Sequence, residues 1–166
     1  MFAEYLDNIN YNNIIICDPI KNSVIDNSSF YKIIYSNDYI SFNGIFCLFN
    51  INNISINKDK IFFNKDDNYY VINKLIKMEE YITNLCQKPK NKNIIYKLKE
   101  LLNNNCIKFV HNDDNNKFNN NNLELFKNNS NNSNNFILKI SGLWQTKENI
   151  GMTFKIIKVD KYLSIC

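Results

Sequence analysis

The residues of this chain that are best suited to chemistry are aromatic rings and lysines. Residues 137–159 carry the single tryptophan, Trp144, and two of the three glycines, Gly142 and Gly151. The alternation of side-chain types in this span predicts a β-hairpin whose turn is 145–151. Lysines and aromatic residues are interleaved on the two predicted strands. Such a surface can stack unpaired bases on its rings and neutralise phosphates with its lysines.

Nine residues are candidates for nucleic-acid binding. Four lysines would neutralise phosphates, and five rings would stack on bases. The lysines are Lys139, Lys147, Lys155 and Lys158, and the rings are Trp144 and Phe154 in the hairpin with Tyr35, Tyr39 and Phe42 in an earlier pair of strands. Each ring also has a plainer interpretation as part of the core, so the lysines are the firmer candidates.

Trp144 illustrates this choice between core and surface. Strict alternation puts it on one strand face with Leu138 and Ile140. Lys139 and Leu143 then lie on the other face. This pattern favours the core for Trp144, because a tryptophan buries a large area when it can, and leaves the binding surface as the alternative.

The sequence lacks the residue patterns that catalysis requires. It has no nucleophile elbow, no phosphate-binding glycine loop, no dinucleotide fingerprint and no pair of histidines. Asp66-Asp67 and Asp113-Asp114 are adjacent pairs, and neighbours in a strand point to opposite faces, so we interpret both as solvated loop charges. His111 has no identifiable partner, and the five cysteines contain no Cys-x-x-Cys. We therefore expect a non-enzymatic protein with no catalytic residue, no metal and no cofactor.

Positive charge is distributed unevenly along the chain, whose formal net charge is +4. Residues 1–73 hold five Lys against eight acidic residues, residues 74–102 seven against three, and residues 139–166 five against two. This asymmetry favours an anionic partner, although lysines also simply solvate exposed faces. All twenty basic residues are Lys. Without Arg there is no bidentate contact to guanine, so base-specific recognition of duplex DNA is disfavoured.

The hydrophobic pattern predicts one mainly β domain, residues 1–166, with helices inserted between strands. Gly44, inside a predicted strand, indicates a bulge or a close approach of another backbone. Phe46 and Phe49 are assigned to the core. Strands are predicted at 12–17, ending at Asp18-Pro19, and at 30–35, 39–51 and 106–110, with weaker candidates at 54–56, 60–63 and 69–72.

Helical spacing replaces this alternation over residues 74–105, the predicted helical insertion. Pro89 separates a first helix from a second, which begins at Asn93. The apolar positions of the first helix recur at three- and four-residue intervals, at Leu75, Met78, Ile82 and Leu85.

Residues 112–135 include thirteen Asn and too few apolar side chains to order themselves, so we predict a disordered Asn-rich loop.

The N-terminal residues and the apolar runs bear on location. No basic region followed by an apolar run occurs at the start of the chain, so we expect no signal peptide. The longest apolar runs are far too short to span a bilayer. We therefore expect an intracellular or virion-enclosed protein that is not secreted and does not contact a membrane.

Two short stretches resemble a known family. Lys-Ile-Ser-Gly-Leu-Trp at 139–144 and Gly-Met-Thr-Phe-Lys at 151–155 resemble the end of the small single-stranded-DNA-binding proteins of large nucleocytoplasmic DNA viruses. A second match is Ile-Tyr-Ser at 34–36 with Phe-Asn-Gly-Ile-Phe at 42–46. The resemblance implies a five-stranded oligonucleotide/oligosaccharide-binding (OB) barrel with a helical insertion, related to the single-stranded-DNA-binding proteins of podophages. Those phage proteins end in an acidic tail with a terminal aromatic, whereas this chain ends in Ser-Ile-Cys.

Two functions are compatible with these features. The first is a non-enzymatic, sequence-independent single-stranded-DNA-binding protein that acts in viral DNA replication or repair inside the host cell. The resemblance implies single-stranded DNA and replication proteins as partners, and it allows a homodimer because the phage proteins are dimers. The alternative is a protein-interaction or structural module on the same fold, with Trp144 buried and the hairpin edge open to a partner strand.

Overall fold

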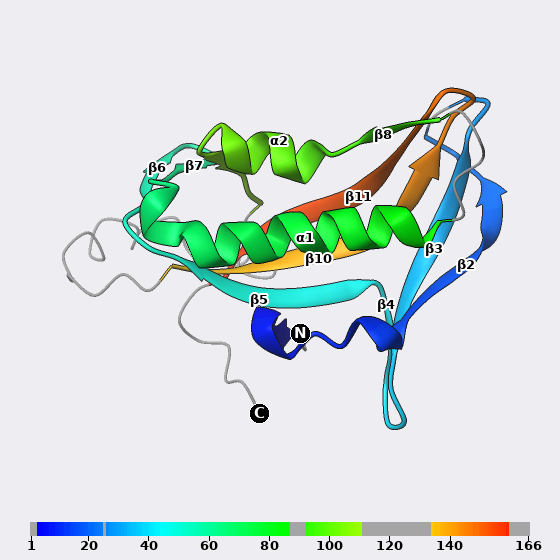
Figure 1. Cartoon of the computed structure of the whole chain (residues 1–166), viewed down its shortest axis with the longest axis horizontal. Helices are drawn as coiled ribbons and strands as arrows, with labels where there is room; N and C mark the ends of the chain where they lie inside the picture. The colour runs from blue at the N-terminus through cyan, green and yellow to red at the C-terminus, as the bar shows by residue number, and fades with distance from the viewer. Residues whose placement is uncertain (1–2, 25, 87–91, 111–133, 160–166) are drawn as a thin grey trace, which may run out of the picture.

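The computed structural model describes residues 3–24, 26–86, 92–110 and 134–159 (Figure 1). The protein is mainly β, with two α-helices inserted between strands. The strands are β1 (Glu4–Tyr5), β2 (Ile14–Lys21), β3 (Ser29–Ser36), β4 (Ser41–Asn43), β5 (Ile45–Ile51), β6 (Ser55–Asn57), β7 (Lys60–Phe62), β8 (Asn93–Ile95), β9 (Cys106–Lys108), β10 (Asn134–Gln145) and β11 (Asn149–Lys158). The helices are α1 (Tyr69–Leu85) and α2 (Lys97–Asn103), with 3-10 helices at Leu6–Asn8, Tyr11–Asn13 and Asp66–Asn68.

Strand β10 is the centre of the larger sheet. It is antiparallel to β11 along most of its length, which confirms the predicted hairpin, although the turn is 146–148 and not 145–151. Its other edge is antiparallel to β5 over residues 134–140 and to β3 over residues 142–145. Farther out, β1 pairs with β5, β2 and β4 pair with β3, and β8 pairs with β11. A second, small sheet has the order β6-β7-β9. The sheets formed by the described residues are not closed into a barrel.

Gly44 is the point at which one segment of the chain changes partners. The strand before it, β4, pairs with β3, and the strand after it, β5, pairs with β10. Its φ is +103°, in the region that side-chain-bearing residues avoid. A Cβ built on Gly44 would lie 2.4 Å from the carbonyl oxygen of Ile140. The predicted close approach of another backbone is confirmed.

The variant Gly44→Ala should lower the free energy of unfolding by at least about 2 kcal/mol, because alanine strains φ and pushes β5 away from β10. Urea denaturation measures the change. Asn43→Ala, at the adjacent exposed position, is the control and should cost less than about 0.5 kcal/mol. Equal stability of the two variants would contradict this role of Gly44.

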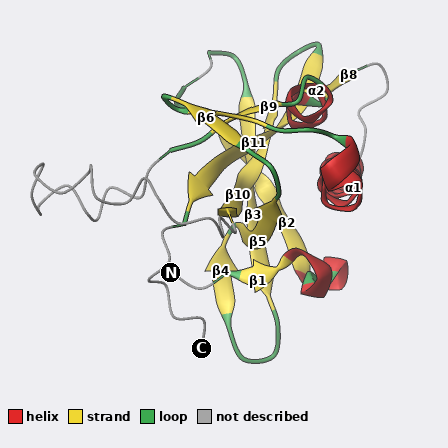
Figure 2. Cartoon of the chain, turned by 90° about the vertical axis from the view of Figure 1, so that its left-hand side faces the viewer, coloured by secondary structure: helices red, strands yellow, loops and turns green. Residues whose placement is uncertain are grey.

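Both helices cover the same face of the larger sheet (Figures 1 and 2). On that face their apolar side chains join those of β3, β5, β10 and β11 in one core. Full burial of such a side chain stabilises the fold by about 1.5–3 kcal/mol. Neither helix in the described part of the chain has the length and apolar character needed to cross a bilayer. The fully buried apolar residues of the helices are Ile72, Leu75, Met78 and Ile82 of α1 and Leu98 and Leu102 of α2.

Several predicted elements are corrected by the structure. Residues 69–72 form the first turn of α1 and not a strand, because Ile72 shares the buried helical stripe with Leu75. Residues 93–95 form β8, parallel to β11, and not the start of a helix. Leu85, predicted on the buried stripe, is 37% exposed at the end of α1.

Two more corrections concern strand boundaries. Strand β2 does not end at Asp18-Pro19 but continues to Lys21 after a shift in its register with β3. The predicted Asn-rich loop extends too far, because its residues 134–135 belong to β10. The rest of that loop, 112–133, lies outside the described residues, as do His111 and the Asp113-Asp114 pair.

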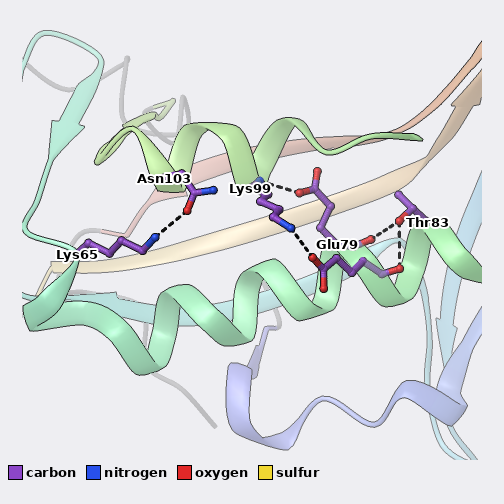
Figure 3. Close-up of polar contacts among 6 residues, drawn as sticks. Lys65, Glu79, Thr83, Lys99 and Asn103 are labelled. Carbon is purple, nitrogen blue, oxygen red and sulfur yellow. Dashed lines mark hydrogen bonds and ion pairs between the residues drawn. The ribbon is translucent and has the colours of Figure 1, made fainter. Parts of the chain in front are cut away.

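A buried carboxylate joins α2 to α1. Glu79, in the middle of α1, accepts hydrogen bonds from the backbone N–H groups of Leu98, at 2.9 Å, and Lys99, at 2.7 Å. Figure 3 shows the second of these bonds. These are N–H groups of the first turn of α2, whose own N-cap residue makes no side-chain bond. An N-terminal turn needs such acceptors and favours negative charge. Lys99 also reaches Glu80 at 2.8 Å, and Lys65 reaches Asn103 at 2.8 Å.

Burial raises the pKa of Glu79 above its ordinary value, although the two N–H donors act to lower it. A glutamate with a raised pKa in the folded state binds its proton more tightly when folded than when unfolded. Its ionisation therefore opposes folding, and its contribution to stability falls as pH rises from about 4.5 through the raised pKa.

The free energy of unfolding of wild type, relative to that of Glu79→Gln, should therefore decrease as pH rises from about 4.5 towards neutrality. Urea denaturation at several pH values measures the difference. Glu100→Gln removes an exposed carboxylate paired with Lys97 and serves as the control. A difference between wild type and Glu79→Gln that does not vary with pH would show that Glu79 does not titrate in this way.

Candidate nucleic-acid interface

A β-bulge in β10 decides which side chains face away from the helices. The register with β11 shifts between Ile140 and Gly142, so Ser141 is the extra residue. Leu143 therefore joins Ile140 in the core under the helices, and both are fully buried. Trp144 moves to the opposite face. The strict alternation that put Trp144 with Leu138 and Ile140 is wrong, because it assumed an unbroken strand.

The face of the larger sheet that points away from α1 and α2 is called here the outer face. Residues paired across neighbouring strands share a face, so the registers assign its members. Its end near Ile137 is closed by a small apolar cluster that includes Ala3 and Val159. The half-buried or exposed members of the outer face are Phe46, which packs against that cluster, and, beyond it, Phe30, Lys32, Ile34, Lys139, Trp144, Thr153 and Lys155, with Ile15 and Ile20 at the β2 edge.

Two half-buried aromatic residues are cross-strand neighbours on the outer face. Phe30 of β3 and Trp144 of β10 are direct partners across the two strands, which places their Cα atoms about 5 Å apart. Each ring occupies space next to a glycine. A Cβ on Gly142 would lie 2.5 Å from Cζ of Phe30, and a Cβ on Gly151 would lie 2.7 Å from Cζ2 of Trp144. The rings thus share one small area of the sheet.

The outer face carries positive charge without acidic neighbours on its main strands. Lys32 and Lys155 are exposed, and Lys139 is half-buried with its Nζ 5.0 Å from the centroid of the Phe46 ring. Strands β3, β4, β5, β10 and β11 contain no Asp or Glu, and the β2 edge carries one acidic residue, Asp18. Within the described part of the chain these three lysines form no ion pair, whereas the four ion pairs found there involve other lysines: Lys74, Lys97, Lys99 and Lys108.

Three of the nine predicted residues therefore gather on the outer face: Lys139, Trp144 and Lys155. Lys147 is exposed in the turn between β10 and β11. Lys158 is half-buried at the end of β11, opposite Phe136. Lys155 and Lys158 are thus three residues apart on β11 and point to different faces.

Three predicted rings point to the helix-covered face. Phe42 and Phe154 are half-buried and pack against the core, and Tyr35 is buried within it. The Tyr35 hydroxyl donates to Oε2 of Glu4 at 2.8 Å, and burial raises its pKa. A ring in that position cannot stack on a base. Tyr39 is 92% exposed, but it lies in the turn of the β3–β4 hairpin, which extends away from the sheet (Figure 1).

Among the rings and lysines of the outer face, sequence reasoning missed Phe30, Lys32 and Phe46. Phe30 and Lys32 alternate in β3 with Tyr31 and Ile33, which contact the core, and this alternation was the signal that could have found them. Phe46, assigned to the core, is instead half-buried beneath Lys139. Phe49 is buried as predicted. The pairing of β3 with the far half of β10 brings Phe30 to Trp144, and no local pattern encodes that pairing.

Comparisons with known proteins identify no relative: no protein-family model, no curated protein and no solved structure matches the chain. In the residues that the structure describes, no three His, Cys, Asp or Glu side chains gather as they would around a metal ion. Function is therefore inferred from the outer face itself.

The position of Trp144 can be tested without any substitution, because it is the single tryptophan of the chain. Acrylamide should quench its emission in the folded protein, since part of the indole is exposed. The quenching constant should lie between zero and that of the urea-unfolded chain. A constant near zero in the folded state would show that the indole is buried and would contradict its position on the outer face.

Proposed function

We propose that this protein is a non-enzymatic, sequence-independent single-stranded-DNA-binding protein and that the outer face is its binding surface. One observation carries the proposal. Lys32, Lys139 and Lys155, which form no ion pair in the described part of the chain, share the outer face with two neighbouring half-buried aromatic residues, Phe30 and Trp144, and all five stand on strands that contain no Asp or Glu. A sheet surface of this kind offers both parts of non-specific single-strand recognition, which are stacking and phosphate neutralisation.

The rings and the lysines of the outer face would make different contacts with the strand. Stacking on an aromatic side chain contributes roughly 1–3 kcal/mol per base and is tolerant of sequence, because every base has a π-face. Lys32, Lys139 and Lys155 would contact phosphates and release condensed cations as the strand binds. Bases in a duplex are already stacked and paired, so rings on a sheet favour unpaired strands. The absence of Arg fits a surface that does not read sequence.

The wider biological setting of the proposal comes from the family resemblance. It implies a role in viral DNA replication or repair inside the host cell, with replication proteins as candidate partners, and it allows a homodimer because the phage proteins are dimers. The OB-like barrel stays a prediction of the same kind. Binding by the outer face does not require a closed barrel, because the rings and lysines lie on neighbouring strands of one sheet.

A second candidate function is a protein-interaction module. It is favoured by Ile15 and Ile20, which are 50% and 60% exposed on β2 beside the outer face. The edge of β11, which that alternative would leave open, is paired with β8 near one end and bridged to Val110 near the other. A protein partner would therefore be expected at β2 and not at the hairpin edge.

The decisive pair of variants is Lys32→Ala with Lys155→Ala, tested by fluorescence anisotropy with a labelled thirty-nucleotide oligo-dT. Loss of two phosphate contacts should weaken binding more than tenfold at about 0.1 M salt and reduce the slope of log Kd against log salt by about 1.4. Duplex of the same length should bind more weakly than the single strand to wild type.

The matched control replaces two exposed lysines elsewhere, Lys60→Ala in β7 with Lys77→Ala in α1, and makes the same change in net charge. The control should keep nearly all of the wild-type affinity. If the two double variants lose affinity equally, binding follows net charge and the outer face is not the site. If wild type does not bind oligo-dT at low salt, the function itself is wrong.

A further inference from the structure

Gly151 lies where glycine is unfavourable unless something requires it. It is a buried position in the middle of a sheet, paired with β10 on one side and with β8 on the other. Glycine at such a position weakens a strand, because it loses the most conformational entropy on folding and has no side chain to pack. The residues around Gly151 therefore have to explain why glycine stands there.

The three glycines of the chain differ in what surrounds them. At Gly44 both φ and the carbonyl oxygen of Ile140 exclude a side chain. At Gly142 the backbone oxygen of Tyr31 would lie 2.3 Å from a Cβ. At Gly151 the backbone φ is not positive, and the three nearest atoms all belong to the indole of Trp144, at 2.7, 2.9 and 3.0 Å from a Cβ. Only the tryptophan requires glycine at position 151.

A side chain at 151 would act on the ring and not on the strand. The indole is the free end of a side chain with two rotatable bonds, so it can rotate away where a backbone atom could not. Alanine at 151 would displace the indole from its place over β11 and leave the lysines of the outer face where they are. The conformation of Trp144 is thus set by its neighbour on β11.

We propose that Gly151 is the positioning residue of a two-ring platform, in which Trp144 and Phe30 receive two neighbouring unpaired bases. Gly151 leaves room for the indole over β11, while the ring of Phe30, the cross-strand partner of Trp144, lies against Gly142. This inference rests on the proposed function, because it assigns the stacking part of binding to two adjacent rings. Phosphate neutralisation by Lys32 and Lys155 does not depend on it.

A double-mutant cycle tests this role, with wild type, Gly151→Ala, Trp144→Ala and the double variant titrated with labelled oligo-dT over a salt series. If Gly151 acts through the indole, Gly151→Ala should weaken binding about as much as Trp144→Ala does, roughly fivefold or more for the loss of one stacked base. The salt slope should not change, because the phosphate contacts remain. In the Trp144→Ala background, Gly151→Ala should change Kd less than twofold.

Tryptophan emission gives a second measurement, which would not change if the role of Gly151 were only structural. Gly151→Ala should shift the emission maximum of the folded protein and reduce its quenching by oligo-dT. Ser55→Ala, an exposed position of β6 in the smaller sheet, is the control and should leave both unchanged.

The outcomes separate this inference from the proposed function. If wild type binds, and Gly151→Ala binds equally well or loses the same affinity in both backgrounds, the positioning role is wrong and the function stands. If Gly151→Ala does not fold, the double variant compared with Trp144→Ala still decides the question, because removal of the indole leaves room for the added methyl. Failure of wild type to bind oligo-dT overturns the function first.

Discussion

The close approach of Gly44 to β10 is the constraint on which the rest of the structure depends. At this point β10 exchanges β5 for β3 as its partner, and the extra residue Ser141 lies directly opposite. The exchange needs a backbone with φ at +103° at Gly44. It also needs a residue without a side chain, because a Cβ on Gly44 would lie 2.4 Å from the carbonyl oxygen of Ile140. The bulge that accompanies it reverses the facing of the residues that follow. Because of this bulge, Leu143 lies in the core and Trp144 lies on the outer face.

The two faces of the sheet divide stability and recognition between them. One face is covered by α1 and α2, whose apolar stripes and the buried carboxylate of Glu79 fix the helices to each other and to the strands. The outer face retains rings and lysines on strands that carry no acidic residue. Phe30 and Trp144 are not part of the main core, so they can stay partly exposed without loss of core packing. In the proposed function, these partly exposed rings contact the single strand.

Local patterns in the sequence predicted local structure well and predicted pairing poorly. The hairpin of β10 and β11, the buried stripe of α1 and the close approach at Gly44 all follow from spacing within a few residues. The face of Trp144 did not, because it depends on a bulge imposed by strands more than ninety residues earlier in the chain. Residues 93–95 were mistaken for helix for the same reason: their strand is defined by pairing with β11 and not by their own pattern. Phe30 entered the site only through its distant partner.

Photochemical crosslinking tests the outer face most directly. The protein would be bound to oligo-dT that carries a single 5-iodouracil, and the complex would be irradiated. The crosslinked protein would then be digested, and the attached residues identified by mass spectrometry. A strand stacked on the outer face should attach to Trp144 or Phe30, with adducts lost when unlabelled single strand competes. Adducts confined to exposed rings of α1, such as Tyr69 and Tyr70, would place the strand on the opposite side of the molecule and contradict the proposed interface.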